Sequence, residues 1–109
     1  MTSALSAPDP HSVLHALGDP TRRTLIEAVT ERPMSVSSLA ERLGVTLTAV
    51  GQHVQVLEDA GLVTSHKSGR VRSVQLATAG FRVLEQWISD RRSPLEQSLD
   101  RLGNLLDEG

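Results

Sequence analysis

Hydrophobic residues recur at helical spacing along most of this 109-residue chain. The spacing predicts helices over residues 11–17, 20–32, 36–43 and 47–60, and a helical region from residue 78 or 79 onward. Residues that favour helix ends separate these segments, namely Gly18, Asp19-Pro20, Pro33, Gly44 and Gly61. Residues 62–66 and 70–76 are rich in Val and Thr with partial alternation, as in strands, and residues 34–36 suit a very short strand. The pattern predicts a mainly α-helical domain with a small β-hairpin.

The stretch 35–62 has the pattern of a helix-turn-helix. Ser35 and Thr46 are placed to cap the N-termini of its two helices, and Gly44 supplies the left-handed residue that ends the first helix. The connection between the helices has the length of the turn in this motif. The inward-facing row of the second helix consists of Val50, Val54 and Leu57.

The opposite side of that second helix is uncharged near its start. The front of such a helix enters the major groove, where Gln pairs with adenine and Thr contacts a base edge or a thymine methyl. Glu58 and Asp59 at its far end would repel phosphate, so contact is expected in the front half only. His53 is either a partly buried packing residue or a DNA contact. Gly51 either allows the backbone to approach DNA closely or is simply tolerated. The candidate DNA-reading residues are Thr46, Thr48, Ala49, Gln52, His53 and Gln55.

The predicted hairpin, with its turn at Ser68-Gly69, is basic. No acidic residue occurs between Asp59 and Glu85, although the chain has a net charge of −2. A hairpin that directly follows a recognition helix is a wing, and its cations would bind DNA phosphates in a salt-dependent way. The candidate phosphate contacts of the wing are Lys67, Arg70 and Arg72.

Two further arginines, Arg22 and Arg23, lie in the first turns of the helix that begins at Pro20. We interpret them as solvated side chains. The alternative is that one of them contacts a DNA phosphate.

The C-terminal region carries a long apolar seam. Leu84 and Ile88 precede Pro94, and leucines spaced four, three and four residues apart follow it in the same register. Pro94 either kinks one helix or separates two. A seam of this length favours packing against a second copy of the chain over covering the domain's own core. The dimerisation residues predicted here are Leu84, Trp87, Ile88, Leu95, Leu99, Leu102 and Leu106.

Composition narrows the function further. The absence of cysteine excludes disulfides and thiolate metal sites, and no apolar run of about 20 residues is present to cross a membrane. Residues 1–10 lack the features of a signal peptide, so we expect a flexible arm on a cytoplasmic protein. His11 and His15 would at most bind a metal weakly, and no histidine has a matched catalytic partner. We therefore expect no enzyme activity, no cofactor and no metal site. The sequence identifies no effector ligand.

Three motifs in order resemble the ArsR/SmtB family of bacterial winged-helix repressors: LGDPTRRTLIEAV, SVSSLAERLGVTLTAVGQHVQVLEDAGLV and the wing GRVRSVQL. The resemblance, which covers residues 14–87, implies a homodimer joined by its first and last helices, with Leu14 on the first. It also implies a repressor that binds a palindromic operator. The segment SVSSLAERL lacks the family's cysteine-containing metal motif, and the last helix lacks the His and acid pairs of the alternative metal site. The chain is thus similar to the branch without metal sensing. Gln52 and Gln55 stand where relatives often carry Lys or Arg, which shifts phosphate binding to the wing.

Together these features predict a single winged helix-turn-helix domain over residues 11–109. Its expected parts are a DNA-reading segment over 35–62, a wing over 62–76 and one or two dimerisation helices over 78–107. The expected function is that of a sequence-specific regulator of transcription, a homodimeric repressor whose partner is double-stranded DNA. The alternative is a winged-helix module that docks another protein and does not bind DNA.

Overall fold

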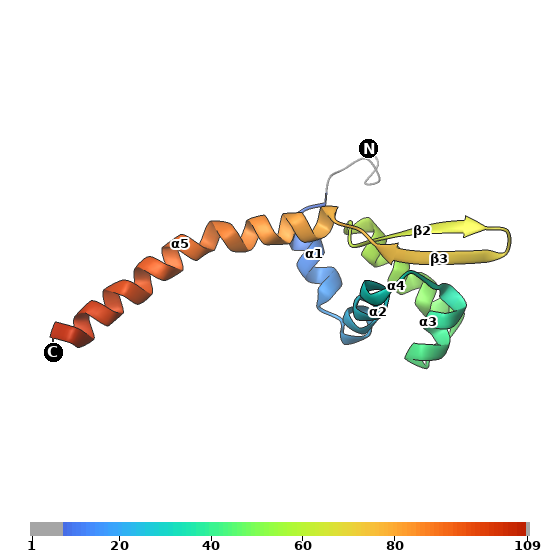
Figure 1. The fold of residues 1–109 in the computed structure, drawn as a ribbon, viewed down its shortest axis with the longest axis horizontal. Coiled ribbons are helices and arrows are strands. Elements are labelled where there is room, and N and C mark those ends of the chain that lie inside the picture. The colour runs from blue at the N-terminus through green and yellow to red at the C-terminus, as the bar shows by residue number, and fades with distance from the viewer. Residues whose placement is uncertain (1–7, 109) are drawn as a thin grey trace.

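The computed structural model describes residues 8–108, which form five helices and three short strands (Figure 1). In chain order these are α1 (Pro10–Leu17), α2 (Pro20–Glu31), β1 (Met34–Ser35), α3 (Val36–Leu43), α4 (Leu47–Asp59), β2 (Val63–Ser68), β3 (Val71–Leu76) and α5 (Ala79–Glu108). The mainly helical fold with a small antiparallel sheet is confirmed. The arm expected over residues 1–10 lies mostly outside the described residues. Asp9 accepts a hydrogen bond from the Ser12 N–H, so α1 begins one residue earlier than predicted.

Helices α1 to α4 form the body of the molecule (Figure 1). The β2–β3 hairpin extends from one end of this body, and α5 leaves from the other. Strand β1 completes a three-stranded antiparallel sheet in the order β1-β3-β2, in which Met34 lies opposite Val74. Strand β2 is therefore an edge strand. The helix predicted over 36–43 is confirmed as α3, and the short strand predicted over 34–36 ends one residue earlier, at Ser35.

The hairpin turn is one residue later than the sequence predicted. Ser68 pairs with Val71, so Gly69 and Arg70 form the turn in place of Ser68 and Gly69. Gly69 has a φ of +62°, and no other residue type among those described adopts a positive φ. Gly at the first central position matches a type II′ turn, whose twist suits a two-residue hairpin. This register places Lys67 opposite Arg72.

The core is aliphatic and lies between α1–α4 and the sheet. The inward row predicted for α4 is confirmed, because Val50, Val54 and Leu57 are all buried. These side chains meet others from the remaining helices and from the sheet. Phe81 is only partly buried against this cluster. The largest fully buried side chains are Leu25, Leu39, Leu57, Leu62, Val13, Val50, Val63 and Val74.

Side-chain caps fix where the helices start. The hydroxyl of Ser35 accepts a hydrogen bond from the Ser38 N–H, and that of Thr46 accepts one from the Ala49 N–H, as predicted. Gly44 ends α3 at a φ of +68°, which sets the angle at which the chain enters α4. Asp19 caps α2, and the hydrogen bond from the Thr21 N–H lowers the pKa of its carboxyl.

Helix α5 runs unbroken through Pro94, so the alternative of two separate helices is wrong. Its first turns pack on α1, and the rest extends away from the body (Figure 1). Pro94 removes one backbone hydrogen bond inside this helix. Within residues 8–108, no helix is long and apolar enough to cross a membrane.

The start of α5 is fixed by a close backbone contact that the sequence did not reveal. The Gly80 N–H donates to the Gly61 carbonyl at 2.8 Å. A Cβ atom at Gly80 would collide with the Ala60 carbonyl oxygen. Glycine is required here because the end of α4 and the start of α5 touch through their backbones.

Candidate nucleic-acid interface

The outer face of α4 presents uncharged polar side chains. Thr48, Gln52 and Gln55 are exposed along one side of the helix, opposite the buried row. The Gln55 amide donates a hydrogen bond to the Asp59 carboxylate at 2.9 Å. Gln52 makes no side-chain hydrogen bond within residues 8–108, so both its donor and its acceptor are available to a ligand. This face can therefore bind a base edge with Gln52 without first losing an internal contact.

Two of the predicted DNA-reading residues lie to the side of this face. Ala49 and His53 are half-buried, and the His53 ring turns toward α2. Its Nδ1 lies 3.5 Å from Nη1 of Arg22. A partly buried packing position is one of the two interpretations that the sequence left open for His53, and the contact with Arg22 agrees with it.

Arg22 is not the solvated side chain that we predicted, whereas Arg23 is exposed but hydrogen-bonded to the backbone. The Arg22 side chain is 13% exposed, and its Nε donates to the Ala16 carbonyl at 2.7 Å. The Arg23 Nη1 donates to the Leu17 carbonyl at 2.6 Å. Both arginines thus satisfy carbonyl groups at the C-terminus of α1, which lack partners inside that helix. The sequence could not show this, because the turn at residues 18–19 decides which carbonyls come within reach.

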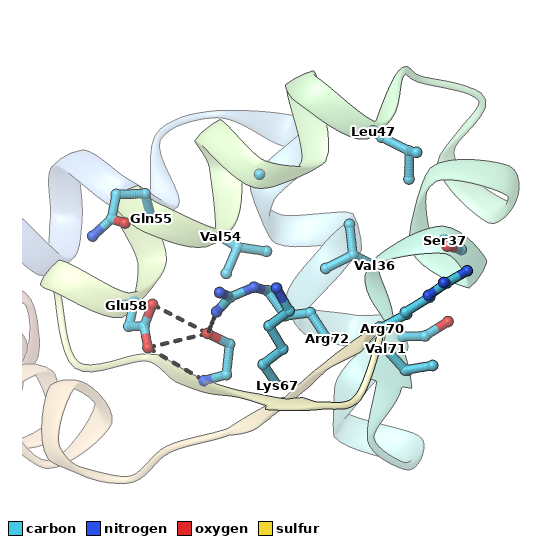
Figure 2. Close-up of a pocket in the computed structure, with 13 residues that line it drawn as sticks. Val36, Ser37, Leu47, Val54, Gln55, Glu58, Lys67, Arg70, Val71 and Arg72 are labelled. Carbon is cyan, nitrogen blue, oxygen red and sulfur yellow. Dashed lines mark hydrogen bonds between the residues drawn. The ribbon is translucent and has the colours of Figure 1, made fainter.

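A groove of about 670 Å³ separates α4 from the hairpin (Figure 2). The start of α3 lines one part of it, and Leu47 and Gly51 line the α4 side. A Cβ atom at Gly51 would meet no atom within 4 Å, so the fold itself does not demand glycine there. The three wing cations predicted from the sequence, Lys67, Arg70 and Arg72, all line this groove. The structure thus places the basic hairpin along one flank of α4, where Gln55 is the predicted DNA-reading residue that also lines the groove.

The three cations differ in their surroundings. Lys67 and Arg70 are exposed and make no hydrogen bond or ion pair to any residue within 8–108. Arg72 is also exposed, but its Nη1 donates to the Ser65 hydroxyl at 2.9 Å. Only the first two are therefore fully available to bind an anion from outside.

Ser65 also bonds to Glu58 near the end of α4. The Ser65 N–H lies 3.3 Å from Oε2 of Glu58, and the hydroxyl lies 3.3 Å from the same oxygen and 3.4 Å from Oε1 (Figure 2). Glu58 is half-buried. It was predicted only as an acid that would repel phosphate, and its contact with β2 was missed because nothing in the residue pattern pairs positions 58 and 65.

The predicted dimerisation residues fall into a half-buried and an exposed group. Leu84 and Trp87 are half-buried, and the guanidinium of Arg91 lies 4.0 Å from the Trp87 ring centre. Leu14 and Ile88 are exposed on adjoining helices. The distal leucines are 54–74% exposed, and they include one that the sequence analysis did not name: Leu95, Leu99, Leu102, Leu105 and Leu106.

The described residues contain no group of three or more His, Asp or Glu side chains placed to hold a metal ion. His11 and His15 are both exposed on α1. The expectation that this chain does not sense a metal stays a prediction.

Known proteins share both the motif and the fold. A family model described as a helix-turn-helix domain matches residues 17–66. The HTH-type transcriptional regulator Rv2034 of Mycobacterium tuberculosis is 39% identical over 75 residues, which cover 69% of this chain and 70% of that protein. YuzN of Bacillus subtilis, an uncharacterized HTH-type transcriptional regulator, is 40% identical over 85 residues, covering 71% of this chain and 92% of YuzN. The crystal structure of the ArsR family transcriptional regulator RHA00566 matches with a TM-score of 0.74 at 32% identity, covering 79% of this chain and 89% of that one.

Proposed function

The chain belongs to the ArsR family of winged helix-turn-helix transcriptional regulators, and from this premise we propose that it is a homodimeric repressor of a palindromic operator. Its coarser function, DNA-binding regulation of transcription, follows from the family. The observation that carries the finer proposal is the groove between α4 and the hairpin, whose lining combines Gln55 of the recognition helix with the three wing cations. A dimer would place two such surfaces on one duplex.

In the proposed complex, the front half of α4 lies in the major groove. Gln52 is the main sequence-reading residue, since it is exposed and keeps both hydrogen-bonding groups available for adenine. Gln55 would exchange its bond to Asp59 for a base contact. The full set proposed to contact DNA from this helix remains Thr46, Thr48, Ala49, Gln52, His53 and Gln55.

The wing is proposed to supply the affinity that the uncharged front half of this helix lacks. Lys67 and Arg70 are proposed to bind phosphates, and each phosphate neutralised releases counterions. Arg72 belongs to the same candidate set, but one of its donors is already bonded to Ser65. Binding should therefore weaken steeply as salt rises, and equally for all sequences.

The dimer is proposed to form through α5 and α1. Leu95, Leu99, Leu102 and Leu106 are each more than half exposed along one helix. A continuous apolar stripe of this kind is unusual on a monomer and marks an interaction surface. Leu14 and Ile88 extend the apolar surface to where α1 meets α5. Half-sites on the operator are then expected about 10 bp apart, or a multiple of that spacing.

Selection of bound fragments from the source genome, followed by a gel shift against scrambled DNA, tests this function. We expect a palindromic site, and we expect Gln52→Ala to change sequence preference while Lys67→Ala weakens binding to every duplex alike. A failure to shift any duplex at low salt would favour the rival function, a module that docks another protein.

Sedimentation of Leu99→Asp against wild-type protein tests the dimer separately. A charge in the apolar stripe should produce a monomer that binds the selected site much more weakly. The matched control is Asp100→Asn, because Asp100 is also exposed on α5 but does not belong to the apolar stripe. A wild-type protein that sediments as a monomer at the concentrations used for the gel shift would refute the dimer.

A further inference from the structure

We infer that Glu58, Ser65 and Arg72 form a hydrogen-bonded chain that fixes the wing against the recognition helix, so that Arg72 is a positioning residue and not a phosphate contact. This inference rests on the proposed function, since it concerns how the same surface meets DNA. It separates Arg72 from Lys67 and Arg70, with which the sequence grouped it.

The first step is the position of Ser65 on an edge strand. Strand β2 pairs with β3 on one side only, so half of its backbone groups have no strand partner. The Ser65 N–H is one of these groups, and it donates to Glu58 on α4. The contact therefore connects two segments that no backbone hydrogen bond joins at this point, the end of the recognition helix and the middle of the wing.

The second step is the location of Glu58 itself. A carboxylate in the last turn of a helix is disfavoured by the negative end of the helix dipole. Glu58 occupies that position in α4 and is half-buried, so its charge needs compensation. The two donors on Ser65 provide hydrogen bonds. The guanidinium of Arg72, bonded to the same hydroxyl, provides nearby positive charge.

The third step is the register of the hairpin. Lys67 and Arg72 lie directly opposite each other, and like charges in that arrangement repel. Ser65 is the diagonal neighbour of Arg72 on the same face, within reach of a long side chain. Arg72 turns toward Ser65 and Glu58, whereas Lys67 stays without an internal partner (Figure 2). The arrangement ties the exposed guanidinium of Arg72 to Ser65 and leaves Lys67 and Arg70 for phosphate.

A double-mutant cycle on DNA affinity tests the inference, with a random-sequence duplex as the probe. Ser65→Ala removes no charge, yet we expect it to weaken binding about fivefold, the scale of one net hydrogen bond. Arg72→Ala should weaken binding by a similar factor, and the double variant should be no weaker than either single one. Such non-additivity identifies residues that act through one another.

The control cycle combines Ser65→Ala with Arg70→Ala. Arg70 lies in the turn and has no bond to the chain, so these two effects should multiply. Affinities are compared at a temperature at which circular dichroism shows every variant to be folded, so that lower stability alone leaves them unchanged. The inference is overturned if Ser65→Ala binds like wild type, or if the losses in Ser65→Ala and Arg72→Ala multiply.

Amide hydrogen exchange provides a test that does not depend on DNA. We expect the Ser65 N–H to be protected in the wild type and to exchange at least about tenfold faster in Glu58→Ala, because that variant removes its acceptor. Thr64→Ala, on the same strand, is the control and should leave the rate unchanged. Wild-type protein that fails to bind any duplex would refute the proposed function, whereas an unchanged rate at Ser65 in Glu58→Ala would refute the chain.

Discussion

Replacement of Arg22 by Ala should destabilise the fold far more than the same change at its neighbour Arg23. Arg22 is 13% exposed in its side chain and donates at 2.7 Å to the carbonyl of the buried Ala16. A hydrogen bond from a charged donor contributes about 1.5–3 kcal/mol. The ion pair with Asp19, at 3.6 Å, adds little at a partly exposed site. We therefore expect a loss of about 2–3 kcal/mol in the free energy of unfolding for Arg22→Ala.

Arg23→Ala is the matched control. Its hydrogen bond to the Leu17 carbonyl is short, at 2.6 Å, but its side chain is exposed, so water can replace the guanidinium. The expected loss is about 1 kcal/mol or less. Arg22→Lys should fall between the two alanine variants, because an ammonium cannot reproduce the planar fork of donors that reaches two carbonyls of α1.

Urea unfolding at one fixed protein concentration measures these differences, since a dimer would make stability depend on concentration. Equal losses at both positions, or a loss below about 0.5 kcal/mol for Arg22→Ala, would show that this arginine is solvated as the sequence suggested. The alternative of a phosphate contact has its own readout. At a temperature at which Arg22→Ala is folded, the dependence of DNA affinity on salt should match that of wild type.

Gly51, Gly80 and the capping carboxylate of Asp19 each allow a further test by a single substitution. Gly51→Ala should raise the free energy of unfolding by about 1 kcal/mol in the same urea assay, because a Cβ atom at this position meets no other atom within 4 Å. A large loss of DNA affinity in this more stable variant would show that the backbone at Gly51 approaches DNA closely. Gly80→Ala should lower the free energy of unfolding by about 1–3 kcal/mol, because the added Cβ atom collides with the Ala60 carbonyl oxygen. Gly103→Ala, in the same helix but with open space around it, is the control and should not lower it. Equal melting temperatures for the two variants would contradict the backbone contact at Gly80. The pKa of Asp19 in the folded protein lies below its ordinary value, chiefly because the Thr21 N–H donates to its carboxylate. Its stabilising effect is therefore present above about pH 4 and is lost as the pH falls through the lowered pKa. Asp19→Asn should make stability depend less on pH in the acid range, and an unchanged stability–pH profile would exclude this cap as a cause.

The ends of the helices were predictable because each depends on one residue and its immediate neighbours. Ser35, Thr46 and Gly44 stand where their hydrogen bonds or backbone angles are needed, and the structure uses them as predicted. The predicted position of the hairpin turn was wrong by one residue, because local sequence is not enough to place it. Both possible frames contain Gly69, and local sequence does not choose between a glycine at the first or the second central position.

The features that were missed all join residues brought together only by folding. Glu58 reaches Ser65 because the chain reverses between α4 and β2, and Gly80 meets Ala60 because α5 starts against the end of α4. Arg22 reaches back over a turn to α1. In each case the residue type was known, but its partner depended on the path of the backbone. Residue spacing could therefore place the recognition face but not the contacts that hold the wing to it.

The charge available to DNA is consequently smaller than the count of wing cations suggests. If Arg72 is the positioning residue inferred above, one of its donors is bonded to Ser65, which in turn donates to Glu58, and its charge is not counted among the phosphate contacts. Lys67 and Arg70 remain, which makes four wing cations in the proposed dimer instead of six. At about 0.9 counterion per phosphate, the wing would contribute a salt slope of about −4 and not about −5. The chain has a net charge of −2, and the outer face of α4 carries no Lys or Arg. In the proposed dimer, the affinity for DNA should therefore depend strongly on these two side chains and on the second subunit.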